Sequence, residues 1–174
     1  MPVVLVLALL LGHAGRHHSS PGAAATGALP AVTVPAPPPN PGADTPCTAV
    51  IGHLPLTLAG LAARPARSTW PYVVAWGNPA IVLRCGVPRP PGLVPGSDAF
   101  TAGIDGVFYW VDHEKSDTVF IAIDRAVYIE VTVPTQYAGG PLAPISDAIT
   151  KALPAVCVVD PNETDLSKLC THRR

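Results

Sequence analysis

The pattern of apolar positions begins with an unbroken run at the amino terminus. Residues 3–11 read VVLVLALLL. This run is about half of the ~20 residues that a membrane-spanning helix needs, and its length suits the hydrophobic region of a secretory signal. Small residues follow at positions 12 and 14, as at a cleavage site, although no positive charge precedes the run. We therefore expect residues 1–14 to be a signal peptide or a short membrane anchor, and the protein to be exported.

A helical pattern opens the part of the chain that we expect to fold. One stripe of a helix would carry the apolar residues Val50, Ile51, Leu54, Leu58 and Leu61. Because Pro55 interrupts this segment, the pattern predicts one helix that ends near His53 and a second short helix that starts at Pro55. A further helix is predicted over residues 145–153.

Alternating patterns between these helices predict strands. The predicted strands are residues 72–76, 81–87, 107–113, 118–123 and 127–134. Asp105-Gly106 is a strong hairpin signal, so residues 99–104 are expected to pair with the strand after the turn. In the last strand, odd-numbered positions are all apolar, which indicates a sheet with one buried side. Helices at both ends of an antiparallel run predict an α+β fold, in which an antiparallel β-sheet packs against a few helices.

Composition divides the chain further. Residues 15–45 are rich in proline and alanine, and they hold too little large apolar surface to fold alone. We expect them to form a flexible, disordered tether, followed by a single domain over residues 46–160 and a tail over 161–174. The tether is either a spacer between the membrane or wall and the domain, or simply a disordered leader.

Charge excludes one class of partner. Eleven Lys and Arg stand against twelve Asp and Glu, and no segment is strongly basic. A nucleic-acid-binding protein needs a cationic surface to neutralise phosphates, so nucleic acid is not expected as a partner. No glycine-rich phosphate loop is present either, and we predict no cofactor.

The four cysteines Cys47, Cys85, Cys157 and Cys170 fit an exported chain with two disulfides. Three connectivities are possible from the sequence; we favour Cys47–Cys85, joining the first helix to a strand, and Cys157–Cys170 in the tail. No two cysteines have the close spacing of a zinc site. A catalytic thiolate at Cys85 would need a base such as His53 or His113, and the spacing selects neither.

Polar candidates are few. Asp112, His113 and Glu114 could bind a divalent cation or supply an acid and a base, which is the basis for an alternative hypothesis of an envelope hydrolase. Alternation, however, puts His113 on the opposite face from Asp112 and Glu114, which favours a solvated hairpin tip. We therefore assign no catalytic or metal-binding residue.

Three residues are candidates for binding a ligand: Arg84, Trp76 and Trp110. Arg84 is the one charge in an apolar strand, so it either pairs with a carboxylate such as Glu130 or anchors an anionic ligand. Exposed tryptophans can stack on sugar rings or on apolar groups of a partner, whereas buried ones belong to the core.

The string WGNPAIVLRCGVPRP, residues 76–90, closely resembles the WG-x-P-x-I-x-LRCGV-x-x-P signature of the actinobacterial domain-of-unknown-function family 3515. Cys47, Leu54-Pro55, Trp110, Ile129-Glu130-Val131 and Val133-Pro134 match further elements of that family, and the resemblance covers about residues 45–155. It implies an exported envelope protein and no particular chemistry. We expect a secreted or membrane-anchored binding or structural module, whose partner is an envelope component or protein.

Overall fold

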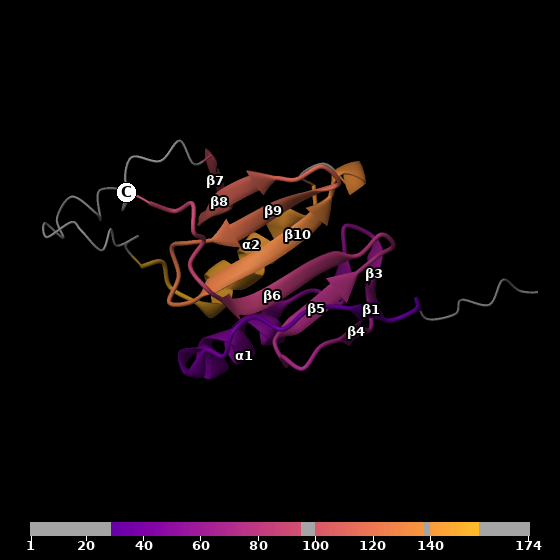
Figure 1. Cartoon of the computed structure of the whole chain (residues 1–174), viewed down its shortest axis with the longest axis horizontal. Coiled ribbons are helices and arrows are strands. Elements are labelled where there is room, and N and C mark those ends of the chain that lie inside the picture. Colours follow the sequence, from indigo (N-terminus) through magenta and orange to yellow (C-terminus); the bar gives the residue numbers. More distant parts are fainter. Residues whose placement is uncertain (1–28, 95–99, 138–139, 157–174) are drawn as a thin grey trace, which may run out of the picture.

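The centre of the protein is an eight-stranded antiparallel sheet with helices on one face (Figure 1). The computed structural model describes residues 29–94, 100–137 and 140–156. The elements are β1 (Val32–Thr33), η1 (Pro41–Ala43), α1 (Asp44–His53), β2 (Thr57–Leu58), β3 (Leu61–Arg64), β4 (Ala66–Arg67), β5 (Val73–Trp76), β6 (Ile81–Val87), β7 (Phe100–Ile104), β8 (Val107–His113), β9 (Asp117–Ala122), β10 (Tyr128–Pro134), η2 (Thr135–Tyr137) and α2 (Leu142–Ala152).

The strand order is β2-β3-β5-β6-β10-β9-β8-β7, so β6 and β10 lie side by side at the centre. Every pairing in this sheet is antiparallel. Helices α1 and α2 contact each other behind the sheet, as Figure 1 shows. The predicted α+β fold is therefore confirmed, with β6 and β8 at the bounds that alternation predicts.

The main core lies between the sheet and the helices. It contains alternate residues of the central strands, such as Leu83, Ile129 and Val131, together with Val50 of α1 and Ile149 of α2. Helix α1 ends at His53 as predicted, because Pro55 forces Leu54 into an extended conformation with φ −67° and ψ 142°. No helix within the described residues is long and apolar enough to span a membrane.

The predicted second helix from Pro55 is wrong, because residues 57–64 form the β2–β3 hairpin. Ala59 and Gly60 make its two-residue turn, with positive φ values of 49° and 82°. Two consecutive positive φ angles suit a tight hairpin and cannot belong to a right-handed helix. Leu58 and Leu61, which helical spacing placed on one stripe, are cross-strand partners instead.

The predicted tether extends too far toward the domain, because residues 29–40 pack against the folded part and contribute β1 to a separate two-stranded sheet; we call this segment the arm. Strand β1 of the arm pairs in parallel with β4. The Val32 and Val34 N–H groups donate to the carbonyl oxygens of Pro65 and Arg67, and Val34 is buried. Apolar residues at alternate positions thus dock an extended segment that composition alone assigns to disorder. The expected signal segment 1–14, the tail 161–174, Cys157 and Cys170 all lie outside the described residues.

A buried hydrogen bond joins the sheet to α2. The hydroxyl groups of Tyr109 on β8 and Ser146 on α2 lie 2.9 Å apart. Burial raises the pKa of Tyr109 from 10.0 to about 12, and the hydrogen bond to Ser146 opposes this only in part. The phenol therefore stays neutral at physiological pH and can keep this bond.

Candidate functional site

The face of the sheet opposite the helices carries a row of side chains that cross strand boundaries. Cross-strand pairing places Arg84 of β6 beside Glu130 of β10, Glu130 beside Ile121 of β9, and Ile121 beside Trp110 of β8. We call this surface the open face. These cross-strand registers bring Arg84 and Trp110 to the same face and into the same row.

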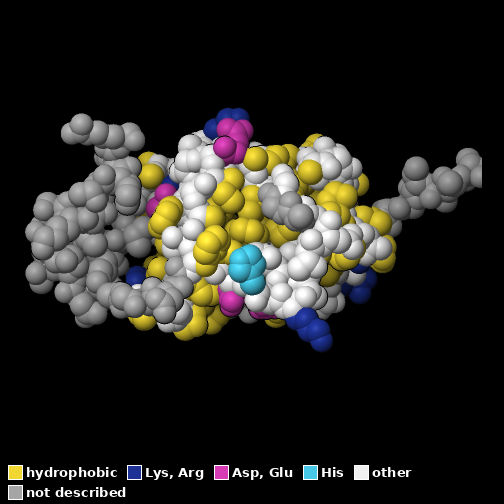
Figure 2. Space-filling view, turned by 90° about the horizontal axis from the view of Figure 1, so that it is seen from above, with side chains coloured by type: hydrophobic (Ala, Val, Ile, Leu, Met, Phe, Trp, Pro, Cys, Tyr) yellow, Lys and Arg dark blue, Asp and Glu magenta, His cyan; other side chains and the backbone are white. Residues whose placement is uncertain are grey.

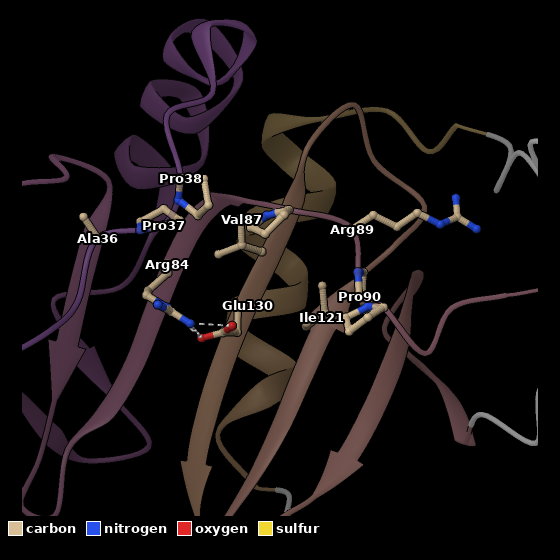
Figure 3. Close-up of a pocket in the computed structure, with 11 residues that line it drawn as sticks. Ala36, Pro37, Pro38, Arg84, Val87, Arg89, Pro90, Ile121 and Glu130 are labelled. Atoms are coloured by element: carbon tan, nitrogen blue, oxygen red, sulfur yellow. Dashed lines mark hydrogen bonds and ion pairs between the residues drawn. The ribbon is translucent and has the colours of Figure 1, made fainter.

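Two proline-rich segments lie over the open face and leave a groove of about 240 Å³ between them (Figure 3). The arm forms one wall, and residues 88–91 form the other. The groove is lined by Ala36, Pro37, Pro38, Arg84, Val87, Pro88, Arg89, Pro90, Pro91, Ile121 and Glu130. Because proline has no N–H group, these walls are largely apolar and offer few backbone hydrogen-bond donors. We call this feature the proline groove.

A bidentate ion pair between Arg84 and Glu130 forms the floor of the proline groove. Arg84 donates from Nε to Glu130 Oε1 at 2.8 Å and from Nη2 to Glu130 Oε2 at 2.7 Å. The planar guanidinium fits a carboxylate in this paired geometry, which is stronger and more directional than a single contact. The predicted pairing of Arg84 with Glu130 is therefore confirmed.

Arg84 also holds the arm in place and keeps donors to spare. Its Nη1 donates to the carbonyl oxygen of Pro35 at 3.2 Å. A guanidinium has five N–H donors, and the bonds to Glu130 and Pro35 use three of them. The Arg84 side chain is 23% exposed against 12% for Glu130, so the cation is the more accessible partner. The groove can therefore offer N–H donors to an acceptor atom between apolar walls.

A disulfide joins helix α1, which follows the arm and η1, to the strand that carries Arg84. Cys47 of α1 and Cys85 of β6 are bonded with a Cα–Cα distance of 5.6 Å, and both are fully buried. The predicted Cys47–Cys85 pairing is confirmed. Since Arg84 precedes Cys85 on β6, one strand points its cysteine toward α1 and its arginine into the groove.

Gly86 allows η1, at the end of the arm, to approach β6 closely. It has a φ of +84°, which favours glycine, and a Cβ at this position would lie 2.7 Å from the Cβ of Ala43. Beside it, Trp70 Nε1 donates to the Cys85 carbonyl oxygen at 2.7 Å. The segment 83–86 therefore contributes to both features: Leu83 and Cys85 lie in the core, and Arg84 lines the groove.

The two tryptophan candidates do not line the groove. Trp76 pairs with Ile81 on the helix-covered face, is fully buried, and donates from Nε1 to the Pro55 carbonyl oxygen. Trp110 is on the open face, but the 88–94 segment packs against it at Leu93 and Gly92. Its Nε1 is buried without a hydrogen-bond partner among the described residues. Of the three ligand-binding candidates, only Arg84 lines the groove.

The polar cluster behind the hydrolase hypothesis lies elsewhere. Asp112, His113 and Glu114 are exposed where β8 turns into β9, and none of them lines the groove. His113 Nδ1 lies 3.3 Å from the Thr118 hydroxyl. Across residues 29–94, 100–137 and 140–156, no three His, Cys, Asp or Glu side chains form a group that could hold a metal ion. The described residues therefore give this hypothesis no site shared with Arg84.

The walls of the groove were not predictable from the sequence. Pro37 and Pro38 fell in the predicted tether, and Pro88, Pro90 and Pro91 fell between the predicted strands 81–87 and 99–104. The only signal was that proline clusters occur both before the first helix and directly after the strand of Arg84. Their approach in space depends on the course of the arm, which has no periodic pattern.

These features define an α+β domain with one disulfide, a docked arm and a groove on the open face of its sheet. A family model described as "Protein of unknown function (DUF3515)" matches residues 1–158. The chain therefore belongs to this family, as its signature string indicates. No curated protein and no solved structure matches the chain.

Proposed function

We propose that this protein is an exported, non-catalytic binding module of the cell envelope, and that the proline groove is its ligand site. The observation that carries the proposal is the pairing of an accessible arginine with apolar walls in one concavity. Small-molecule sites commonly combine apolar walls with a few polar groups that fix orientation.

Export is supported by two independent features. The apolar run at residues 3–11 has the length of a signal hydrophobic region. The Cys47–Cys85 disulfide is of a kind that persists in oxidising compartments and is rare in the cytosol. Both features suit an extracytoplasmic domain that is secreted or held at the membrane by its amino-terminal segment.

The chemistry of the groove favours a small apolar group that carries an acceptor oxygen. A volume of about 240 Å³ is smaller than the ~300–1,000 Å³ of sites for drug-sized ligands. The groove therefore suits one end or one branch of a larger envelope component. The two remaining N–H donors of Arg84 would hold a carboxylate or carbonyl oxygen, while Val87, Ile121 and the prolines contact the apolar part.

A matched pair of probes tests this proposal: cyclohexanecarboxylate, and cyclohexylmethanol, which lacks the carboxylate. Titration followed by amide and arginine-Nε NMR shifts is expected to show saturable changes at Arg84, Val87 and Ile121. We expect the carboxylate to bind at least about threefold more tightly than the alcohol, because hydrogen bonds to charged groups are the stronger ones.

Filling the groove should abolish these changes. Ala36 is exposed on the arm and lines the groove, so Ala36→Trp places a ring in it without altering the ion pair. The matched control Ala143→Trp is on an exposed position of α2 and should bind as the wild type does. If neither probe shifts groove residues, or if Ala36→Trp binds the carboxylate like the control, the groove is not the ligand site.

A further inference from the structure

The two edges of the sheet differ in a way that bears on assembly. At one edge, β2 has only two residues, and short edge strands are a common protection against association. At the other edge, β7 has five residues, Phe100–Ile104, with no charge and no proline. Within the described residues, β7 pairs only with β8, so its outer edge has no partner strand there.

The backbone groups on that outer edge can be identified. Ile123 N–H donates to the Phe108 carbonyl oxygen, so the backbone of Phe108 faces β9 rather than β7. Gly103 is the cross-strand partner of Phe108, and its backbone therefore faces away from β8. Backbone direction alternates along a strand, so the N–H and C=O groups of Thr101, two residues before Gly103, also point away from β8. Thr101 and Gly103 thus each present one N–H and one C=O outward.

Apolar side chains surround this edge. Phe100 is 61% exposed and Phe108 is 38% exposed. Gly103, beside Phe108 in the register, leaves open space where a Cβ would point. Figure 2, which views the molecule from the side of β7, shows hydrophobic side chains gathered over the middle, with acidic and basic ones toward the periphery. An added strand would both cover these apolar groups and satisfy the outward backbone groups.

We propose that β7 pairs with β7 of a second copy, antiparallel and centred on Ala102, to form a two-fold symmetric dimer with a continuous sheet. This is the one antiparallel register in which all five residues pair with residues of the copy's β7. Thr101 then lies opposite Gly103 of the copy, which gives four backbone hydrogen bonds across the two-fold axis. Thr101 also places its methyl group over the space beside Phe108.

The same register is favourable on the helix-covered side. There, the exposed Phe100 lies opposite Ile104 of the copy, and aromatic–β-branched pairs stabilise antiparallel strands. No like charges meet, because the strand contains none. The strand is therefore complementary to itself, which is what a two-fold interface requires.

The dimer would place two proline grooves on one side of a single sheet. The groove is built on β6, β10 and β9, with β8 between it and β7, so pairing leaves it open. A two-fold axis perpendicular to the sheet keeps both open faces on the same side. A repetitive envelope component could then be held at two points, with a gain in avidity and no new contact within either site.

Charges placed on the edge test both the dimer and its register. Sedimentation of the full chain over about 5–500 μM should show reversible dimerisation in the micromolar range. In Thr101→Glu/Gly103→Glu, the proposed register sets a carboxylate opposite a carboxylate twice, which should raise the dissociation constant at least about tenfold. In Thr101→Lys/Gly103→Glu, each ammonium faces a carboxylate of the copy, and the dissociation constant should return to within about threefold of wild type.

Both substituted positions are exposed, and circular dichroism checks that each variant folds. Ala126→Glu/Ala143→Glu adds the same charge at exposed positions off the strand and should leave dimerisation unchanged. A chain that stays monomeric throughout the range overturns the proposal, as does a dimer that the two glutamates leave intact. Dissociation by the two glutamates without rescue by lysine also overturns it, because the register would be wrong.

Discussion

Replacing both Cys47 and Cys85 with alanine is expected to lower the free energy of unfolding by about 4 kcal/mol. The bond spans a sequence separation of 38, and in the chain-entropy model a loop of this length restricts the unfolded chain by about that amount. Domains of this size are typically stable by only ~5–15 kcal/mol, so the loss would remove a large part of the total. Urea unfolding of the oxidised wild type and the double variant measures it.

Reduction provides the matched control for the disulfide. Wild-type protein unfolded in the presence of dithiothreitol should be destabilised by a similar amount, because it lacks the same bond but keeps both sulfur atoms. The two results together separate loss of the cross-link from loss of buried side-chain volume. If the double variant unfolds within about 1 kcal/mol of the oxidised wild type, the disulfide does not hold α1 and the arm on the sheet.

Removing Arg84 alone is expected to be nearly as harmful. Arg84→Leu leaves the Glu130 carboxylate without the two hydrogen bonds that the guanidinium supplies. Breaking a buried pair in this way costs about 3–5 kcal/mol, and we expect the lower end because Arg84 is 23% exposed. The same substitution also removes the contact from Nη1 to the Pro35 carbonyl oxygen, so the arm should become easier to cleave by protease.

A double variant tests whether the loss of stability in Arg84→Leu comes from the Glu130 carboxylate that is left without its partner. Arg84→Leu/Glu130→Leu removes both charges, and we expect it to recover most of the stability lost in the single variant. Arg67→Leu is the control, because Arg67 is an exposed arginine and its loss should change stability by less than about 0.5 kcal/mol. A double variant as unstable as Arg84→Leu would mean that the pair is not the source of the loss.

Most of the sheet could be predicted because its side chains repeat with a period of two. In β10, Ile129, Val131 and Val133 face the helices, and Glu130 and Thr132 are on the open face. The hairpin between β7 and β8 was marked by Asp105-Gly106, both of which have positive φ. Where a strand is long and one of its faces meets the core, the sequence carries enough information to place it.

Two segments could not be predicted, for different physical reasons. Strands β2 and β3 are too short to show alternation, and the spacing of Leu54, Leu58 and Leu61 also fits a helix. The arm has few repeating side-chain contacts, so its position depends on backbone bonds at Val32 and Val34 and on the Pro35 contact to Arg84. Backbone hydrogen bonds of this kind leave no mark in composition.

The candidate site was predictable only in part. A lone arginine in an apolar strand indicated a partner, and Glu130 on the neighbouring strand is that partner. Trp76 and Trp110 were equally good candidates from the sequence, because their faces are settled only by cross-strand registers with Ile81 and Ile121. The proline walls come from segments about 50 residues apart, which only the folded arm brings together.

The disulfide between Cys47 and Cys85 joins α1 to the strand that carries Arg84, and it is one of the two features that support the proposed export. The most direct test is to alkylate the protein isolated from its own host under denaturing, non-reducing conditions and to map the cysteines by mass spectrometry. We expect the peptides of Cys47 and Cys85 to be recovered as one cross-linked species, with neither cysteine alkylated. Recovery of Cys85 as a free, alkylated thiol would contradict the proposed construction of the site and reopen the possibility of thiol chemistry at that strand.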